Sequence, residues 1–141
     1  MAVVIQGRTL VAGAGRGVLL VSDEPLSFWG GYDADSGEII DRRHPLSGQN
    51  SAGCVLALPG SRGSSTTTAV MLEAIRAGVA PAAMVLSQAD DFFALAAIVA
   101  DELYGRTIPI IQVDSDQFSR LESGGYASVQ PDGTITIEET D

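Results

Sequence analysis

The sequence has very few side chains that bind transition metals tightly. Among its 141 residues there is one cysteine, Cys54, and one histidine, His44. A single cysteine cannot form a disulfide within the chain, and one cysteine with one histidine cannot complete a zinc or iron–sulfur site. We therefore expect no metal or other cofactor to be bound by this chain. Cys54 lies in the apolar run 53–58 and is predicted to be an inert, buried thiol.

Positive charge is also scarce, because the chain has no lysine and its 8 basic residues, all arginine, face 18 acidic residues. The formal net charge is −10. Binding to a nucleic-acid backbone needs clustered positive charge, so we expect no nucleic-acid partner. Four arginines fall at predicted turns in the first half of the chain, namely Arg16, Arg42, Arg43 and Arg62. Either some of them gather into a positive pocket, or they lie scattered over the surface.

Long apolar runs are missing as well. No segment approaches the roughly 18 apolar residues that a membrane span requires, and the N-terminus lacks the charged and apolar regions of a secretory signal. We therefore expect a cytoplasmic protein with no membrane partner. Apolar residues make up 45% of the chain and charged residues 18%, which is typical of a compact globular protein. The length predicts one domain spanning 1–141.

The pattern of apolar residues predicts an α/β fold with a β-rich front, a parallel middle and a C-terminal hairpin. Short strands are expected at 2–5, 9–12, 17–21 and 38–41. The middle should be a right-handed βαβαβ unit, with strands at 53–58, 82–86 and 108–113 and helices at 65–77 and 89–103. Asp90 and Asp91 fall in the first turn of the second helix. A turn or short helix is expected at 115–122, and Pro131-Asp132-Gly133 predicts the hairpin turn.

The most informative segment is the loop that joins the predicted strand 53–58 to the predicted helix 65–77. It reads Leu58-Pro59-Gly60-Ser61-Arg62-Gly63-Ser64-Ser65. Gly60 and Gly63 permit a tight turn and a close approach of the backbone to a ligand. The unpaired amides of a helix N-terminus attract anions, and Arg62 adds a planar charged group for a carboxylate or phosphate. The hydroxyl of Ser64 would then lie beside the bound charge.

The same loop also suits a purely structural role. Ser64 or Ser65 is an ordinary N-cap residue, and glycines are typical of a strand-to-helix turn. The loop is not a P-loop, because the GxxxxGK[ST] pattern is absent. The glycine-rich segment 13–17 joins two strand-like runs and opens no helix, so it is not a dinucleotide-binding turn.

Five segments, in this order, resemble the small, or swivel-domain, subunit of the aconitase X family. They are Pro25-Leu26-Ser27-Phe28-Trp29-Gly30-Gly31, Ser36-Gly37-Glu38-Ile39-Ile40-Asp41, His44-Pro45-Leu46-Ser47-Gly48, Leu58-Pro59-Gly60-Ser61-Arg62-Gly63-Ser64-Ser65 and Gly78-Val79-Ala80-Pro81-Ala82-Ala83. The resemblance implies a swivelling β/β/α domain like the mobile last domain of aconitase. It also implies a large partner subunit that carries an iron–sulfur or iron centre.

The resemblance further implies a hydro-lyase that is active only with that partner. Bacterial members of the family dehydrate cis-3-hydroxy-L-proline to pyrroline-2-carboxylate, and archaeal members dehydrate mevalonate 5-phosphate. In both, the serine after the second glycine of the loop is the catalytic base, which corresponds to Ser64. The rest of the loop, Ser61, Arg62, Gly63 and Ser65, is expected to bind the substrate carboxylate. Arg62 and residues 65–68 look more like the bacterial form.

Several roles stay open at this point. His44 is either a second acid–base group or, as such histidines more often are, a side chain that holds a loop. Phe28 and Trp29 are expected in the core, with a substrate-facing role as the alternative. Two other functions compete with the dehydratase: a module that binds a carboxylate without chemistry, and a structural interaction domain.

Overall fold

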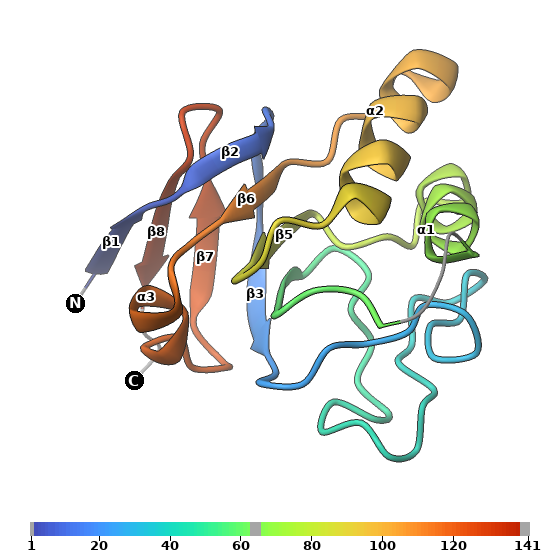
Figure 1. Ribbon diagram of the computed structural model, residues 1–141, viewed down its shortest axis with the longest axis horizontal. Helices are drawn as coiled ribbons and strands as arrows, with labels where there is room; N and C mark the ends of the chain where they lie inside the picture. The colour runs from blue at the N-terminus through green and yellow to red at the C-terminus, as the bar shows by residue number, and fades with distance from the viewer. Residues whose placement is uncertain (1, 63–65, 139–141) are drawn as a thin grey trace.

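Eight strands form a curled mixed sheet in the computed structural model, which describes residues 2–62 and 66–138 (Figure 1). The strands are β1 (Ala2–Gln6), β2 (Arg8–Val11), β3 (Gly15–Val21), β4 (Val55–Leu58), β5 (Ala83–Leu86), β6 (Ile110–Gln112), β7 (Tyr126–Val129) and β8 (Thr134–Glu138). Their order across the sheet is β1-β8-β7-β3-β4-β5-β6-β2. Only Gly7 separates the two outermost strands in the chain, and one residue spans about 3.5 Å. The sheet must therefore curl until its two ends are neighbours.

Gly7 is required at this junction because there is no room for a side chain. A Cβ at this position would collide with Cγ2 of the buried Ile111 and lie 3.0 Å from the carbonyl oxygen of Gln112. The amide of Gly7 also donates a hydrogen bond of 2.9 Å to the carbonyl oxygen of Gly133, in the turn between β7 and β8. The close approach of these backbones closes the sheet.

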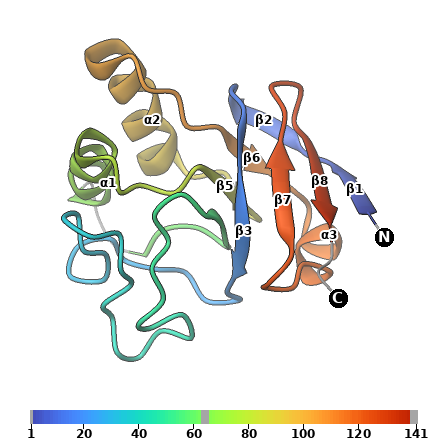
Figure 2. The same cartoon turned by 180° about the vertical axis from the view of Figure 1, so that it is seen from behind.

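The strands β3, β4, β5 and β6 run parallel and form the centre of the sheet. All residues of β4 and β5 are buried, as expected for parallel strands covered on both faces. Two helices, α1 (Thr66–Ala77) and α2 (Asp91–Tyr104), pack against each other beside these strands. Figures 1 and 2 show both helices at one end of the molecule, with β1, β7, β8 and the short α3 (Ser115–Ser119) at the other.

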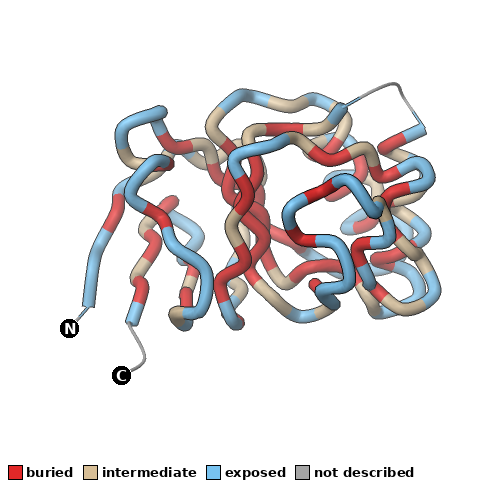
Figure 3. The backbone as a smooth tube through the Cα atoms, turned by 90° about the horizontal axis from the view of Figure 1, so that it is seen from below, coloured by how far each residue is buried: buried red, intermediate tan, exposed pale blue. Residues whose placement is uncertain are grey.

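Alternate side chains of the parallel strands point into two different cores. Leu56 and Leu58 of β4 pack with residues of α1 and α2, including Met71 and Phe93. Val55 and Ala57, on the other face, pack with residues of α3, β7 and β8. Figure 3 shows the buried residues gathered along the central strands, with the exposed residues mainly in the outer turns. The central strands therefore hold the helical and antiparallel halves together.

The predicted mixed α/β fold, with its parallel middle and C-terminal hairpin, is confirmed. The prediction of a strand at 38–41 is wrong. In this region Ile39 and Glu38 make only isolated bridges, to Tyr32 and Asn50 respectively. Glycines with positive φ, Gly37 and Gly48, turn the chain on either side, so the apolar pair Ile39-Ile40 cannot extend into a ladder.

The expectation that two adjacent aromatic residues lie in the core is confirmed for one and wrong for the other. Phe28 is fully buried, stacks on Tyr32 with ring centroids 4.4 Å apart, and meets Phe93 edge-on at 4.9 Å. Trp29, by contrast, is 69% exposed. The amide of Tyr32 donates to the carbonyl oxygen of Phe28, so the chain turns here and only one of the two neighbouring side chains can point inward.

Candidate functional site

The glycine-rich loop begins at the carboxyl end of β4, as predicted, and runs beside residues 22–27. Leu26 donates a backbone hydrogen bond of 3.4 Å to Gly60, and Arg62 donates one of 3.2 Å to Leu26. Helix α1 begins at Thr66. The loop is thus held at the edge where ligands bind in parallel sheets. The predicted catalytic Ser64 and the predicted binding residues Gly63 and Ser65 lie outside the described residues, so their roles stay predictions.

The first turn of α1 combines polar groups with an absence of acidic residues. Thr67 is 1% exposed, and its hydroxyl has no hydrogen-bond partner among the described residues. Thr68 donates a hydrogen bond of 3.0 Å to the carbonyl oxygen of Phe92 in α2. Because this turn contains no acidic residue of its own, the partial positive charge of the helix terminus favours a bound anion. This supports the expected role of the loop in binding a carboxylate.

Ser61 is tied to Asp90 rather than turned toward open space. Its backbone amide and its hydroxyl donate hydrogen bonds of 2.7 Å and 2.6 Å to the same oxygen, Oδ2 of Asp90. The hydroxyl proton is therefore already engaged, so any contact of this side chain with a substrate would have to use the hydroxyl oxygen as an acceptor. The expected role of Ser61 in binding substrate stays a prediction.

Asp90 is a residue of the site that sequence reasoning missed. It was expected in the first turn of its helix, whereas the structure makes it the N-cap of α2. Its Oδ1 accepts hydrogen bonds from the amides of Phe92 at 2.9 Å and Phe93 at 3.1 Å. An aspartate directly before a helical run is an N-cap signal that could have been recognised. The contact with Ser61, 29 residues away, has no sequence signal.

Arg62 is exposed, and its guanidinium forms no ion pair with any other residue that the structure describes. Arg16 does not join it. Arg16 lies near the start of β3, opposite Ser128, whereas the loop lies beyond the far end of that strand. Arg42 and Arg43 are exposed in the turn before His44. Arg16 therefore takes no part in any positive pocket at the loop.

His44 is buried, and both of its ring nitrogens have partners within the protein. Nδ1 accepts a hydrogen bond of 3.2 Å from the amide of Leu46, which assigns the ring proton to Nε2. Nε2 lies 3.1 Å from the carbonyl oxygen of Glu24 and 3.4 Å from the hydroxyl of Ser22. These contacts fasten the 41–46 turn to the segment that follows β3. Of the two roles considered, the geometry favours the one in which His44 holds a loop.

Cys54 is half-buried rather than buried, and it precedes β4 instead of lying in it. Its thiol donates a hydrogen bond of 3.6 Å to the carbonyl oxygen of Asn50, and burial raises its pKa. A raised pKa lowers the fraction of reactive thiolate. The prediction of burial is therefore wrong in degree, while the expectation of low reactivity is supported.

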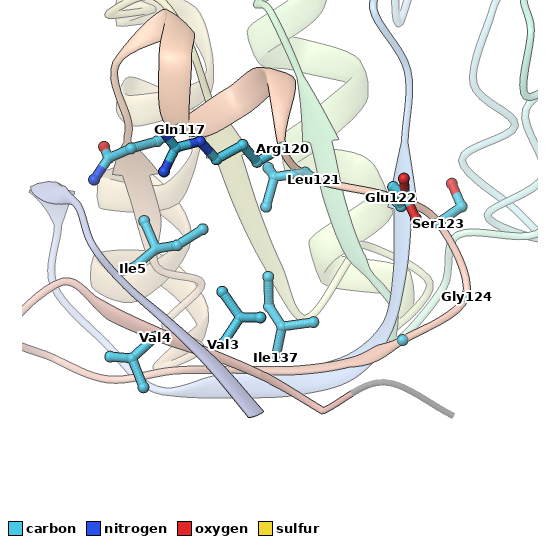
Figure 4. A pocket seen from close by; sticks show the side chains of 11 residues that line it. Val3, Val4, Ile5, Gln117, Arg120, Leu121, Glu122, Ser123, Gly124 and Ile137 are labelled. Carbon is cyan, nitrogen blue, oxygen red and sulfur yellow. The ribbon is translucent and has the colours of Figure 1, made fainter. Parts of the chain in front are cut away.

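Two further findings concern the rest of the molecule. Across residues 2–62 and 66–138, no group of three or more His, Cys, Asp and Glu side chains could hold a metal ion, and no helix has the length and hydropathy to cross a membrane. A cavity of about 470 Å³ lies between β1, α3 and the turn at 120–125 (Figure 4). Val3, Ile5, Leu121 and Ile137 line it with apolar side chains. This cavity belongs to the antiparallel half and does not include the glycine-rich loop.

The comparisons with known proteins agree with this geometry. Residues 4–137 match the family described as the aconitase X swivel domain. The chain belongs to this family. A chain of the crystal structure of Thermococcus kodakaraensis aconitase X, in its holo-form, superposes on this aconitase X swivel domain with a TM-score of 0.86 and 31% identity. The match covers 97% of this chain and 99% of that chain, which confirms the expected fold.

Relatives of this swivel domain have two kinds of organisation. The chain is 55% identical over 130 residues to the cis-3-hydroxy-L-proline dehydratase of Pseudomonas aeruginosa, covering 92% of this chain and 22% of that protein. It is 37% identical over 136 residues to the phosphomevalonate dehydratase small subunit of Thermococcus onnurineus, covering 96% of this chain and 98% of that subunit. The chain thus spans about a fifth of the longer relatives and nearly all of the small subunit.

Proposed function

We propose that this chain is the small subunit of a hydro-lyase that dehydrates cis-3-hydroxy-L-proline to pyrroline-2-carboxylate. The observation that carries the proposal is the 55% identity to the Pseudomonas aeruginosa dehydratase over 92% of this chain. The phosphomevalonate dehydratase small subunits from Thermococcus onnurineus and Methanothermobacter thermautotrophicus are 37% and 43% identical. The higher identity favours the hydroxyproline substrate. A cytoplasmic location belongs to the same proposal.

In the proposed reaction the chain supplies the base and the anion-binding loop. The Cα–H and C3–O bonds break, a C=C bond forms between these carbons, and the hydroxyl and the proton leave as water. Ser64 takes the proton from Cα, next to the substrate carboxylate. A serine is a weak base unless its alkoxide is stabilised, and the amides at the start of α1 together with Arg62 are suited to that task. Arg62 and the α1 terminus also bind the carboxylate.

The proposal requires a second subunit for the metal. An aconitase-like reaction needs a Lewis acid on the leaving hydroxyl, which an iron or iron–sulfur centre supplies when bound. The described residues of this chain contain no set of ligands for such a centre. The Pseudomonas aeruginosa relative carries more than three quarters of its length outside the matched region, and other relatives are named small subunits. We therefore place the centre in a large aconitase X partner.

A second substrate, mevalonate 5-phosphate, is supported by a separate observation. The chain covers 98% of the Thermococcus onnurineus small subunit but 22% of the Pseudomonas aeruginosa dehydratase, so in length it resembles the phosphomevalonate enzymes. Arg62 and an acid-free helix terminus suit a phosphate as well as a carboxylate.

The test is to express the chain with and without its large aconitase X partner and to assay both substrates. We expect iron and turnover only in the complex, and turnover of cis-3-hydroxy-L-proline rather than of mevalonate 5-phosphate. Preference for the phosphorylated substrate would replace the first proposal with the second. A complex that binds carboxylates but dehydrates neither substrate would identify a non-catalytic binding module.

A further inference from the structure

Both flanks of the predicted catalytic loop are fastened to the first turn of α2. On one side, the amide and hydroxyl of Ser61 donate to Oδ2 of Asp90 at 2.7 Å and 2.6 Å. On the other side, the hydroxyl of Thr68 donates to the carbonyl oxygen of Phe92 at 3.0 Å. Ser61 and Thr68, on either side of this segment, are therefore both attached to one turn of a neighbouring helix. Figure 1 shows α1 and α2 side by side, as these contacts require.

Asp90 uses both oxygens of its carboxylate. Oδ1 accepts the amides of Phe92 and Phe93, and Oδ2 accepts both donors of Ser61. Hydrogen bonds to a charged acceptor are stronger and shorter than neutral ones. Gly60 lies against the same oxygen, because a Cβ there would be 3.4 Å from Oδ2. One half-buried side chain thus caps α2 and fixes the entry to the loop.

The turn that carries Asp90 cannot shift without disturbing the core. Phe93 is fully buried and meets the ring of Phe28 at 4.9 Å. Ala96, Ala97 and Ala100 continue the buried face of α2, and α1 and α2 pack against each other. The Asp90 carboxylate is therefore a rigid attachment point, which a residue on a mobile loop would not be.

We propose that Asp90 is a positioning residue for Arg62: its link to Ser61 fixes where the adjacent Arg62 stands relative to the start of α1. Asp90 acts through Ser61 and does not touch the reacting atoms. The inference rests on the proposed function, because it assumes that the loop supplies the base. Small misplacements of catalytic groups are enough to lower the rate of turnover strongly.

The chain allows the link to be broken while the helix cap is kept. In Asp90→Ser the shorter side chain remains a good N-cap residue but withdraws the acceptor from Ser61. In Asp90→Asn one oxygen becomes an NH2 group, so the amide can serve either the cap or Ser61 but not both. Asp114→Asn is the matched control, because Asp114 caps α3 through Gln117 in the antiparallel half and does not contact the loop.

Two readouts test the proposal. In the complex with the large partner, kcat of Asp90→Ser and Asp90→Asn should fall about 10- to 100-fold and KM should rise, because Arg62 is misplaced rather than lost. Limited trypsin cleavage of the purified chain after Arg62, followed by mass spectrometry, should become at least about tenfold faster, as expected when a local attachment is lost. Asp114→Asn should match the wild type in both readouts.

The proposal would be overturned if either kcat or the trypsin cleavage rate of the Asp90 variants equalled that of Asp114→Asn. An unchanged cleavage rate would mean that the link does not hold the loop, and an unchanged kcat would mean that the link does not matter for turnover. A wild-type complex that turns over neither substrate would instead contradict the proposed function. In that case the cleavage rate alone still decides whether Asp90 holds the loop. A loss of activity that follows only a lower melting temperature, with kcat per folded complex unchanged, would also count against a positioning role.

Discussion

In the half of the domain that carries α1 and α2, the strands run parallel, and the carboxyl ends of β3, β4, β5 and β6 all meet at one edge. In the other half, β1, β8 and β7 run antiparallel, so their ends alternate and the chain returns through tight turns such as 130–133. The first half gathers the glycine-rich loop, the start of α1, and Asp90 at one edge. The second half contains the cavity and closes the sheet through Gly7.

The parallel half therefore carries the candidate site, and the antiparallel half closes the sheet. Parallel strands need crossover connections, and the two connections that follow β4 and β5 each contain a helix whose N-terminus lies near the same edge. Antiparallel hairpins place no helix N-terminus there. We therefore expect substitutions at the glycine-rich loop to affect turnover more than folding. Substitutions at Gly7, the junction between β1 and β2, should affect folding more than turnover.

The largest effect is expected for Ser64→Ala. If Ser64 is the base, its loss should lower kcat of the complex by about 10²- to 10⁴-fold. Folding should be almost unaffected, because even the loss of a helix N-cap side chain destabilises a protein by only about 1 kcal/mol. The measurement is steady-state kinetics together with thermal unfolding. Ser65→Ala is the matched control and should lower kcat far less, since the resemblance assigns the base to the serine that directly follows the second glycine of the loop. Equal, modest losses in both variants would remove the base from this loop.

The next largest effect is expected for Arg62→Lys. Replacing a planar guanidinium with a point charge should raise KM and lower kcat, for a loss of about 2–4 kcal/mol in transition-state stabilisation. Arg76→Lys is a suitable control, because Arg76 is exposed at the other end of α1 and pairs with Glu73. Kinetics of Arg62→Lys that match those of Arg76→Lys would show that Arg62 is an ordinary surface residue.

Gly7→Ala, in contrast, is expected to affect folding rather than turnover. Its Cβ would collide with Ile111, so the free energy of unfolding should fall by about 1–3 kcal/mol, as for an overpacked core. Because Gly7 is remote from the glycine-rich loop, kcat per folded complex should change less than about twofold. Denaturant unfolding and active-site titration check the two parts. A large loss of kcat in correctly folded Gly7→Ala complex would contradict the division of tasks.

The smallest effect concerns Tyr32, which is buried in the core against Phe28. Its hydroxyl donates to the carbonyl oxygen of Val79 at 2.7 Å and accepts from Ser51 at 3.0 Å, and burial raises its pKa to about 12. Tyr32→Phe should lower the free energy of unfolding by about 1–2 kcal/mol at neutral pH.

The pH dependence follows from the raised pKa of Tyr32. An ordinary tyrosine ionises near pH 10, so between about pH 10 and 12 the folded protein holds a proton that the unfolded chain has lost. The stabilisation is complete below pH 10 and declines as the pH rises toward 12. The stability difference between wild type and Tyr32→Phe should therefore shrink over this range in urea unfolding series. A constant difference from pH 7 to 12 would contradict it.

The parts of this account that depend on periodicity were predictable from the sequence. Apolar runs such as 55–58 and 83–86 predict buried parallel strands, and the segment Pro131-Asp132-Gly133 predicts the hairpin turn. The curling of the sheet was not predictable, because the pairing of β2 with β6 joins segments about a hundred residues apart. Nor was the outward orientation of Trp29, because one turn of the chain decides which of two adjacent aromatic residues is buried.

The candidate site shows the same limit. The loop itself is recognisable from its glycines, its arginine and its place between a strand and a helix. Its attachment to Asp90 is not, because an aspartate at a helix start has a sufficient local role as a cap, and nothing in the sequence shows that its second oxygen serves Ser61. The role of His44 likewise depended on which carbonyl and amide groups surround its ring.

The most direct test of the central claim is exchange of the Cα proton of cis-3-hydroxy-L-proline with deuterated solvent, followed by NMR in the assembled complex. Wild type and Ser65→Ala should both incorporate deuterium at Cα, because both retain the proposed base. Ser64→Ala should not incorporate it, although it still assembles with the partner. Continued exchange in Ser64→Ala would contradict the claim that this chain supplies the catalytic base, and it would leave the loop with a role in binding only.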